Sequence, residues 1–136
     1  MNRAISIALA LISVVVLAGT VLAAKPVTSS LSLVVLSGDG FTPLAAAVPE
    51  HGGEVTFEVS TTQTERPFVN VRCYQGGNWV YDGWHGFFES YVPDPVYTLS
   101  SLYWTSGEAN CTANLVMWTK SARLKTLAST SFHVSD

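Results

Sequence analysis

Hydrophobic and polar residues alternate along the chain beyond residue 25, and this alternation predicts β-strands. The segment 55–60, which reads Val-Thr-Phe-Glu-Val-Ser, is the clearest example. Successive side chains of a strand point to opposite faces, so such a segment has one face suited to a core and one suited to water. No heptad or helical periodicity is found in this part of the chain. The pattern therefore favours an all-β fold.

Gly, Pro, Asn and Ser interrupt the alternating runs at intervals of roughly eight to twelve residues, a spacing typical of β-sandwiches. The segment 82–91 contains glycines and aromatic residues without alternation and is expected to be irregular, and 120–125 is expected to form a hairpin loop. A short edge strand is expected between the two prolines at 43 and 49, over 44–48. The other predicted strands are 31–36, 55–59, 68–74, 79–81, 96–99, 109–118 and 127–134.

The two cysteines fall on the apolar side of two predicted strands. Cys73 shares a face with Val69 and Val71, and Cys111 shares a face with Ala113 and neighbouring apolar residues. Two core-facing cysteines in an exported chain predict one disulfide, Cys73–Cys111. A pair of buried free thiols is the alternative.

Three segments, 71–81, 104–113 and 127–134, resemble small secreted bacterial immunoglobulin-like (Ig-like) domains of uncharacterised function. The resemblance implies an Ig-like antiparallel β-sandwich of seven or eight strands. Antibody domains carry their cysteines on strands B and F, which lie in opposite sheets. Here the natural strand B, 55–59, has no cysteine, and Cys73 lies on the following strand, C. The predicted disulfide would therefore join neighbouring strands C and F of one sheet.

The N-terminus has the form of a secretory signal peptide. Arg3 precedes an uncharged apolar stretch from Ile5 to Ala18, and Val21-Leu22-Ala23 fits a cleavage site. We expect a signal-peptide helix over 1–23, a single sandwich domain over 24–136, and a secreted protein. The alternative is an uncleaved segment that anchors the protein in the membrane, since 4–24 is long enough to span a bilayer.

The charge balance argues against nucleic acid as a partner. The whole chain has 7 Lys+Arg and 10 Asp+Glu, a formal net charge of −3. Phosphate recognition needs clustered basic residues, and the one such cluster, Lys120, Arg123 and Lys125, lies in the predicted hairpin loop. We expect no nucleic-acid partner and, once the signal peptide is removed, no membrane contact.

Catalytic and metal motifs are missing from the sequence. There is no Gly-x-Ser-x-Gly nucleophile motif, and His51, His85 and His133 are far apart with no ligand spacing. Asp39 lies in a Gly-rich turn without the further acidic residues of a calcium loop. We therefore expect a protein that is not an enzyme and that needs no cofactor or metal ion.

Two sets of residues suggest binding. The first is the outward face of strands C, F and G, where Asn and Thr residues lie beside Tyr74, Asn114 and Trp118, a composition suited to an extracellular protein partner. The second comprises Trp79, Tyr81 and Trp84 in the aromatic segment after strand C, with Trp84 expected on a loop, a set suited to a glycan. Some aromatic residues of this part of the chain are expected in the core instead. These are one of Phe87 and Phe88 and one of Tyr103 and Trp104, and Leu99 is expected to pack with them. An ordinary solvated sheet face is the alternative for the first set, and a purely structural role of the protein stays open, as do ligand identity and oligomeric state.

Overall fold

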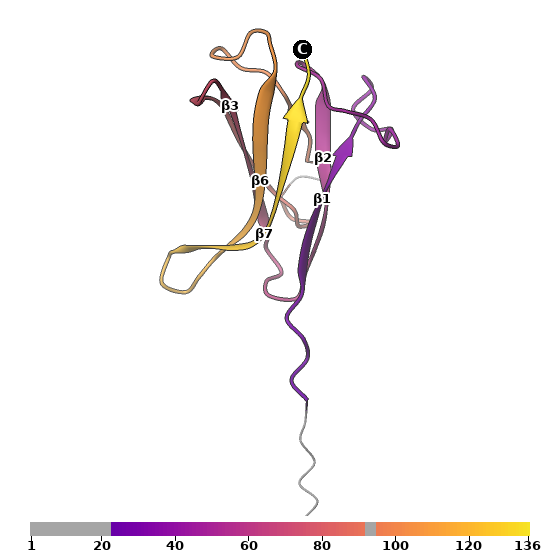
Figure 1. Cartoon of the computed structure of the whole chain (residues 1–136). Coiled ribbons are helices and arrows are strands. Elements are labelled where there is room, and N and C mark those ends of the chain that lie inside the picture. Colours follow the sequence, from indigo (N-terminus) through magenta and orange to yellow (C-terminus); the bar gives the residue numbers. More distant parts are fainter. Residues whose placement is uncertain (1–22, 92–94) are drawn as a thin grey trace, which may run out of the picture.

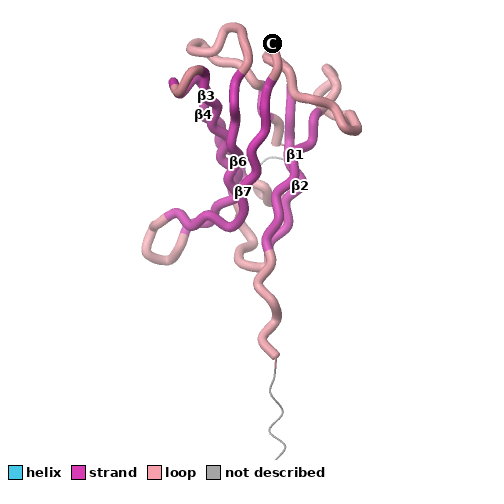
Figure 2. Tube along the Cα trace, viewed as in Figure 1, coloured by secondary structure: helices cyan, strands magenta, loops and turns pink. Residues whose placement is uncertain are grey.

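The computed structural model describes residues 23–91 and 95–136, and in these residues every regular element is a strand. The predicted signal-peptide helix lies outside the described residues. Seven strands form two antiparallel sheets that pack in a sandwich-like arrangement around one core (Figures 1 and 2). The strands are β1 (Ser29–Val35), β2 (Glu54–Thr61), β3 (Phe68–Gln75), β4 (Asn78–Gly86), β5 (Tyr97–Thr98), β6 (Ala109–Trp118) and β7 (Leu124–Val134).

The smaller sheet has the strand order β1-β2-β5, and the larger has the order β4-β3-β6-β7. Strands β3 and β6 are central in the larger sheet, and this explains their high apolar content. Their inward side chains are almost completely buried, which confirms the faces expected from the alternation. These inward residues are Val69, Val71, Cys73, Ala109, Cys111, Ala113 and Leu115.

Cys73 and Cys111 form a disulfide, as predicted. The two residues lie directly opposite each other in the β3–β6 pairing, and their Cα atoms are 4.0 Å apart. Pairs without mutual backbone hydrogen bonds approach more closely than hydrogen-bonded pairs, so such a position suits a link across neighbouring strands. The bond thus lies within one sheet, as the position of Cys73 on the strand after β2 indicated.

Tyr97 and Trp104 are the two largest fully buried side chains. The Tyr97 hydroxyl donates a hydrogen bond of 2.8 Å to the Val69 carbonyl, so that one side chain ties the smaller sheet to the larger. Trp104 lies in the connection from β5 to β6, and its Nε1 donates to the Gly107 carbonyl at 2.9 Å. Leu99 is also buried, while Tyr103 is exposed, so the expected core aromatic of this pair is Trp104.

The prediction of an irregular segment over 82–91 is wrong for its first half, because β4 continues to Gly86. Gly83 marks a close approach within the strand. A Cβ atom at Gly83 would lie 2.7 Å from the Tyr81 hydroxyl and 2.9 Å from Tyr97 Cδ1. A glycine in a strand often marks such a contact rather than a loop.

The predicted edge strand over 44–48 is absent from the structure. This segment contains a turn, and Ala46 has a φ of 53°, a left-handed conformation that interrupts an extended chain. Isolated bridges form on either side of this segment, between Leu36 and Pro43 and between Glu50 and Ser135. The last strand begins at Leu124 rather than 127, so the hairpin loop is shorter than expected.

Candidate functional site

The outer face of the larger sheet carries three rows of side chains that run across all four strands. We use "outer face" for these residues, which point away from the smaller sheet. Each row is given in the strand order β4, β3, β6, β7. The first row is Trp79, Tyr74, Asn110 and His133. The second row is Asp82, Arg72, Thr112 and Ser131, and the third row is Trp84, Asn70, Asn114 and Ser129.

The half of the outer face on β6 and β7 is polar and internally hydrogen-bonded. His133 Nδ1 and Asn110 Oδ1 are 3.0 Å apart, and the hydroxyls of Thr112 and Ser131 are 3.3 Å apart. In the third row the Ser129 hydroxyl donates to Asn114 Oδ1. These residues bond to one another across the strands, so this half forms an ordered polar surface.

The half on β3 and β4 is built around Arg72 and Asp82. Arg72 Nε lies 3.7 Å from Asp82 Oδ2, and the guanidinium carbon lies 5.4 Å from the centre of the Trp79 ring. Asn70 Nδ2 donates to the other Asp82 oxygen and, at 3.2 Å, to the Gly83 carbonyl. Asn70 is only 4% exposed, so this residue serves to hold Asp82 rather than to offer a free amide.

Aromatic rings surround this charged pair. Trp79 is 57% exposed, Tyr74 40% and Trp84 37%. Trp84 lies on β4 and not on a loop, because the strand runs through the glycines on either side of it. The Trp79 indole is held in place, since its Nε1 donates to the Tyr81 carbonyl at 2.8 Å while Arg72 packs against the ring. An exposed ring that is fixed from two sides is preorganised for a ligand.

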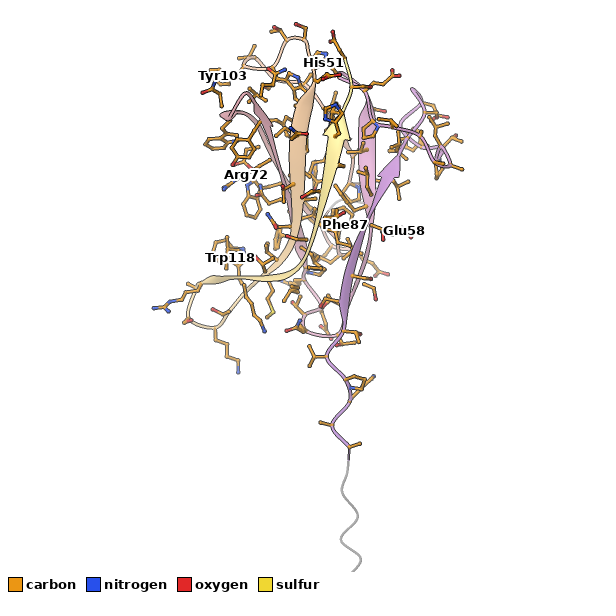
Figure 3. All side chains as sticks on the ribbon, in the orientation of Figure 1. His51, Glu58, Arg72, Phe87, Tyr103 and Trp118 are labelled. Carbon is orange, nitrogen blue, oxygen red and sulfur yellow. A yellow bond between two sulfur atoms is a disulfide. The ribbon has the colours of Figure 1, made fainter. Side chains whose placement is uncertain are left out.

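A groove of about 550 Å³ lies beside the outer face, between β4 and the connection from β5 to β6. Trp79 and Tyr103 come from these two segments, and Tyr103 is 83% exposed. In Figure 3, Tyr103 and Arg72 lie on the same side of the molecule, while Glu58 of β2 lies on the other side. The lining residues are Trp79, Val80, Tyr81, Asp82, Ser101 and Tyr103.

The structure does not gather all the residues that the sequence suggested into one site. Trp79 and Tyr81 meet in the groove, but Tyr81 also faces inward, with its ring 6.4 Å from that of Trp104. Trp84 belongs to the third row of the outer face. Tyr74 pairs with Asn110, and Trp118 is eight residues further along β6, about 26 Å away at the usual rise of a strand.

Trp118 instead lines a separate hollow of about 510 Å³. Trp118 is 54% exposed, and Phe68, Phe88 and Arg66 line the same hollow. The Arg66 guanidinium carbon lies 5.8 Å from the Phe88 ring centre. Val116, which the alternation placed on the exposed face, is buried, and an irregularity in the β6–β7 register lies between Leu115 and Val116. A bulge of this kind changes the direction of side chains beyond it.

Two residues of the site were missed by sequence reasoning. Arg72 is not among the binding residues expected from the sequence, although an arginine close to aromatic residues is typical of binding surfaces. Tyr103 was considered only for the core. Tyr103 lies in the turn between Ser101 and Trp104, and no alternation in the sequence marks its side chain as exposed.

Over residues 23–91 and 95–136, no cluster of three or more His, Cys, Asp or Glu side chains is placed to hold a metal ion. Asp39 acts within its own turn: its carboxylate accepts hydrogen bonds from the backbone amides of Phe41 and Thr42, each at 2.9 Å, and from two hydroxyls. In the same part of the chain, no helix has the length and apolar character needed to cross a membrane.

In comparisons with known proteins, no family model, curated protein or solved structure matches this chain.

Proposed function

We propose that this protein is an exported Ig-like module that works by binding, and that an extracellular partner protein contacts the outer face of the larger sheet. Tyr74, Arg72 and Trp84 form the centre of the proposed contact. The proposal treats the protein as non-catalytic.

The strand order supports the Ig-like part of the proposal. With the seven strands lettered A, B, C, C′, E, F and G along the chain, the smaller sheet is A-B-E and the larger is C′-C-F-G. Ig-like domains pair A, B and E in one sheet and C, F and G in the other. The disulfide differs from the antibody pattern, since it joins C to F.

Export is supported by the N-terminal sequence, in which Arg3, the apolar stretch and the cleavage pattern at Ala23 follow one another in the order of a secretory signal. A disulfide agrees with an oxidising compartment.

The observation that carries the binding proposal is the cluster of exposed Tyr and Trp rings around Arg72. Tyr, Trp and Arg are the residue types that contribute most to protein–protein binding energy. Here they lie on a sheet face whose polar side chains on β6 and β7 are already ordered by cross-strand hydrogen bonds. A partner would therefore bind rigid side chains and lose little conformational entropy in ordering them.

Site-specific photocrosslinking tests this proposal. A photoreactive residue replaces Thr112, beside Arg72, and the full-length protein is expressed in its own cells, with adducts collected from the medium and the cell surface. We expect adducts of discrete mass from Thr112. The same replacement at Glu58, on the opposite sheet, serves as the matched position and should give none, because Glu58 faces the other side of the molecule.

Trp84→Ala then tests the aromatic centre. Loss of a central aromatic residue typically costs about 2 kcal/mol or more, so we expect affinity to fall about thirtyfold or more and adduct yield to fall with it. Tyr74→Ala is the second variant, in case the first perturbs β4, and circular dichroism verifies folding. Equal adducts from both crosslinker positions, or yields unchanged by both substitutions, would contradict the proposal. An adduct at twice the chain mass would identify a second copy as the partner.

Carbohydrate recognition is the second candidate function, and the groove between Trp79 and Tyr103 is the observation that favours it.

A further inference from the structure

We infer that the groove between β4 and the β5–β6 connection is a binding site for a neutral saccharide. The inference rests on the second candidate function above. The groove shares Trp79 and Asp82 with the outer face, and Tyr103 and Ser101 of the β5–β6 connection complete it. Its volume of about 550 Å³ falls within the usual range of small-ligand sites.

Trp79 of β4 and Tyr103 of the β5–β6 connection both line the groove. The Trp79 indole is locked by its hydrogen bond to the Tyr81 carbonyl and by the Arg72 guanidinium. Trp79 and Tyr103 are each more than half exposed, whereas aromatic side chains of folded proteins are on average largely buried. The exposed rings of Trp79 and Tyr103 line one groove, and this favours a ligand with apolar faces.

The loop that carries Tyr103 is held firmly against β4. The Ser101 hydroxyl donates to the Val80 carbonyl at 2.5 Å and accepts from the Tyr103 amide at 3.0 Å. The next residue, Trp104, is buried in the core and anchors the other end of the loop. The backbone position of Tyr103 is therefore set by the fold, so that binding needs little loop ordering.

The polar groups of the groove select the ligand class. A sugar ring presents C–H groups on its faces, which stack on aromatic rings, and hydroxyls on its rim, which donate hydrogen bonds. Asp82 supplies a carboxylate that accepts from hydroxyls, and the Tyr103 hydroxyl can donate or accept. Among the described residues no Lys or Arg lines the groove, and Arg72 beside it is already paired with Asp82, so an acidic sugar finds no free cation there and a neutral sugar is favoured.

A peptide strand added to the edge of β4 is the competing occupant, since this strand lies at the edge of its sheet. Strand addition requires free backbone groups along the edge. The carbonyls of Val80 and Tyr81 already accept hydrogen bonds from Ser101 and Trp79. These two carbonyls are therefore not free to pair with an added strand, whereas a ligand that stacks on side chains does not need them.

Saturation-transfer NMR on the purified protein tests the inference, with cellohexaose, xylohexaose and chitohexaose as neutral probes and a hyaluronan hexasaccharide as the acidic probe. At least one neutral probe is expected to bind, and the acidic probe more weakly. Tyr103→Ala should weaken binding about tenfold or more, which corresponds to about 1.4 kcal/mol per factor of ten. Tyr103→Phe keeps the ring and should retain most of the affinity.

Leu102→Ala is the matched control, since Leu102 is the exposed neighbour of Tyr103 and does not line the groove. Its affinity should equal that of the unaltered protein. Absence of binding by every neutral probe, preference for the acidic probe, or equal loss in the Leu102 and Tyr103 variants would overturn the inference. Trp84→Ala separates the two sites: it should reduce crosslinking from Thr112 while leaving hexaose binding intact.

Discussion

At the scale of single residues, two tyrosines between the sheets respond to pH. Burial raises the pKa of Tyr97, whose hydroxyl bonds to Val69 across the core. Burial, with a smaller contribution from the negative charge of Asp82, raises the pKa of Tyr81 to about 12. Both hydroxyls are therefore favoured in their neutral form by the folded protein.

These shifts predict a loss of stability in alkali. A tyrosine in the unfolded chain has a pKa of about 10. The free energy of unfolding should therefore be highest below pH 10 and should fall as the pH rises towards 12. In that window the unfolded state releases tyrosine protons that the folded state retains. Urea midpoints measured across this window check the prediction. Tyr81→Phe should show a shallower decline, and an equally steep decline would exclude Tyr81 as a source.

Gly83 predicts a second effect at this scale. Gly83→Ala would place a methyl group within 3 Å of the Tyr81 and Tyr97 rings, and overpacking of this kind typically costs about 1–3 kcal/mol. Thermal unfolding measures the change. Gly38→Ala is the control, since no atom lies within 4 Å of its added carbon. Similar melting temperatures for both variants would mean that β4 moves freely to accept the methyl group.

At the scale of elements, the disulfide connects the two central strands of the larger sheet. It closes a loop with a sequence separation of 38 residues, and both cysteines are buried. By the loop-entropy estimate such a link contributes about 3–4 kcal/mol, mainly by restricting the unfolded chain. Strands β3 and β6 carry the first, second and third rows of the outer face, so their pairing also positions the binding residues.

The double variant Cys73→Ala/Cys111→Ala is expected to lower the free energy of unfolding by about 2–5 kcal/mol without changing the strand content. Denaturant midpoints and far-ultraviolet circular dichroism check the two parts of this prediction. In the unaltered protein, alkylation should label neither cysteine until a reductant is added. An unchanged midpoint in the double variant would show that packing alone holds β3 to β6.

At the scale of the whole molecule, charges are segregated between the two ends of the sandwich. The end from which the chain runs towards its N-terminus, visible in Figure 1, carries most of the basic residues, with Glu65 and Glu89 as its acidic ones. These basic residues are Lys25, Arg66, Lys120, Arg123 and Lys125. The other end carries Asp39, Glu50, Glu54, Glu108 and Asp136 and, among the described residues, no Lys or Arg.

This asymmetry predicts weak, salt-dependent attraction to an anionic bilayer in spite of the negative net charge. Co-sedimentation with vesicles of equal parts phosphatidylglycerol and phosphatidylcholine should detect it at low ionic strength. The triple variant Lys120→Gln/Arg123→Gln/Lys125→Gln should lose it, whereas Lys120→Arg/Arg123→Lys/Lys125→Arg should keep it. No sedimentation at low salt would instead agree with the expectation from sequence that the mature protein contacts no membrane.

The alternation of residues by itself determined the strand class, most strand positions and the partners of the disulfide. The reason is local: at most positions of β2, β3 and the part of β6 before its bulge, the polarity of a residue indicates which face it occupies. Cys73 and Cys111 followed because both lie in clean alternating runs. The segments where prediction was wrong, 44–48 and 82–86, depend on a left-handed Ala46 and on the space around Gly83.

Only the tertiary structure decided which binding residues come together. Tyr103 meets Trp79 because a loop folds against the edge of β4, while Trp118 lies at the far end of β6 from Tyr74. Such neighbours are set by the pairing of strands distant in sequence and by the bulge after Leu115. The polarity of a residue tells which face it occupies, but the rows across a face depend on register, which no single strand encodes.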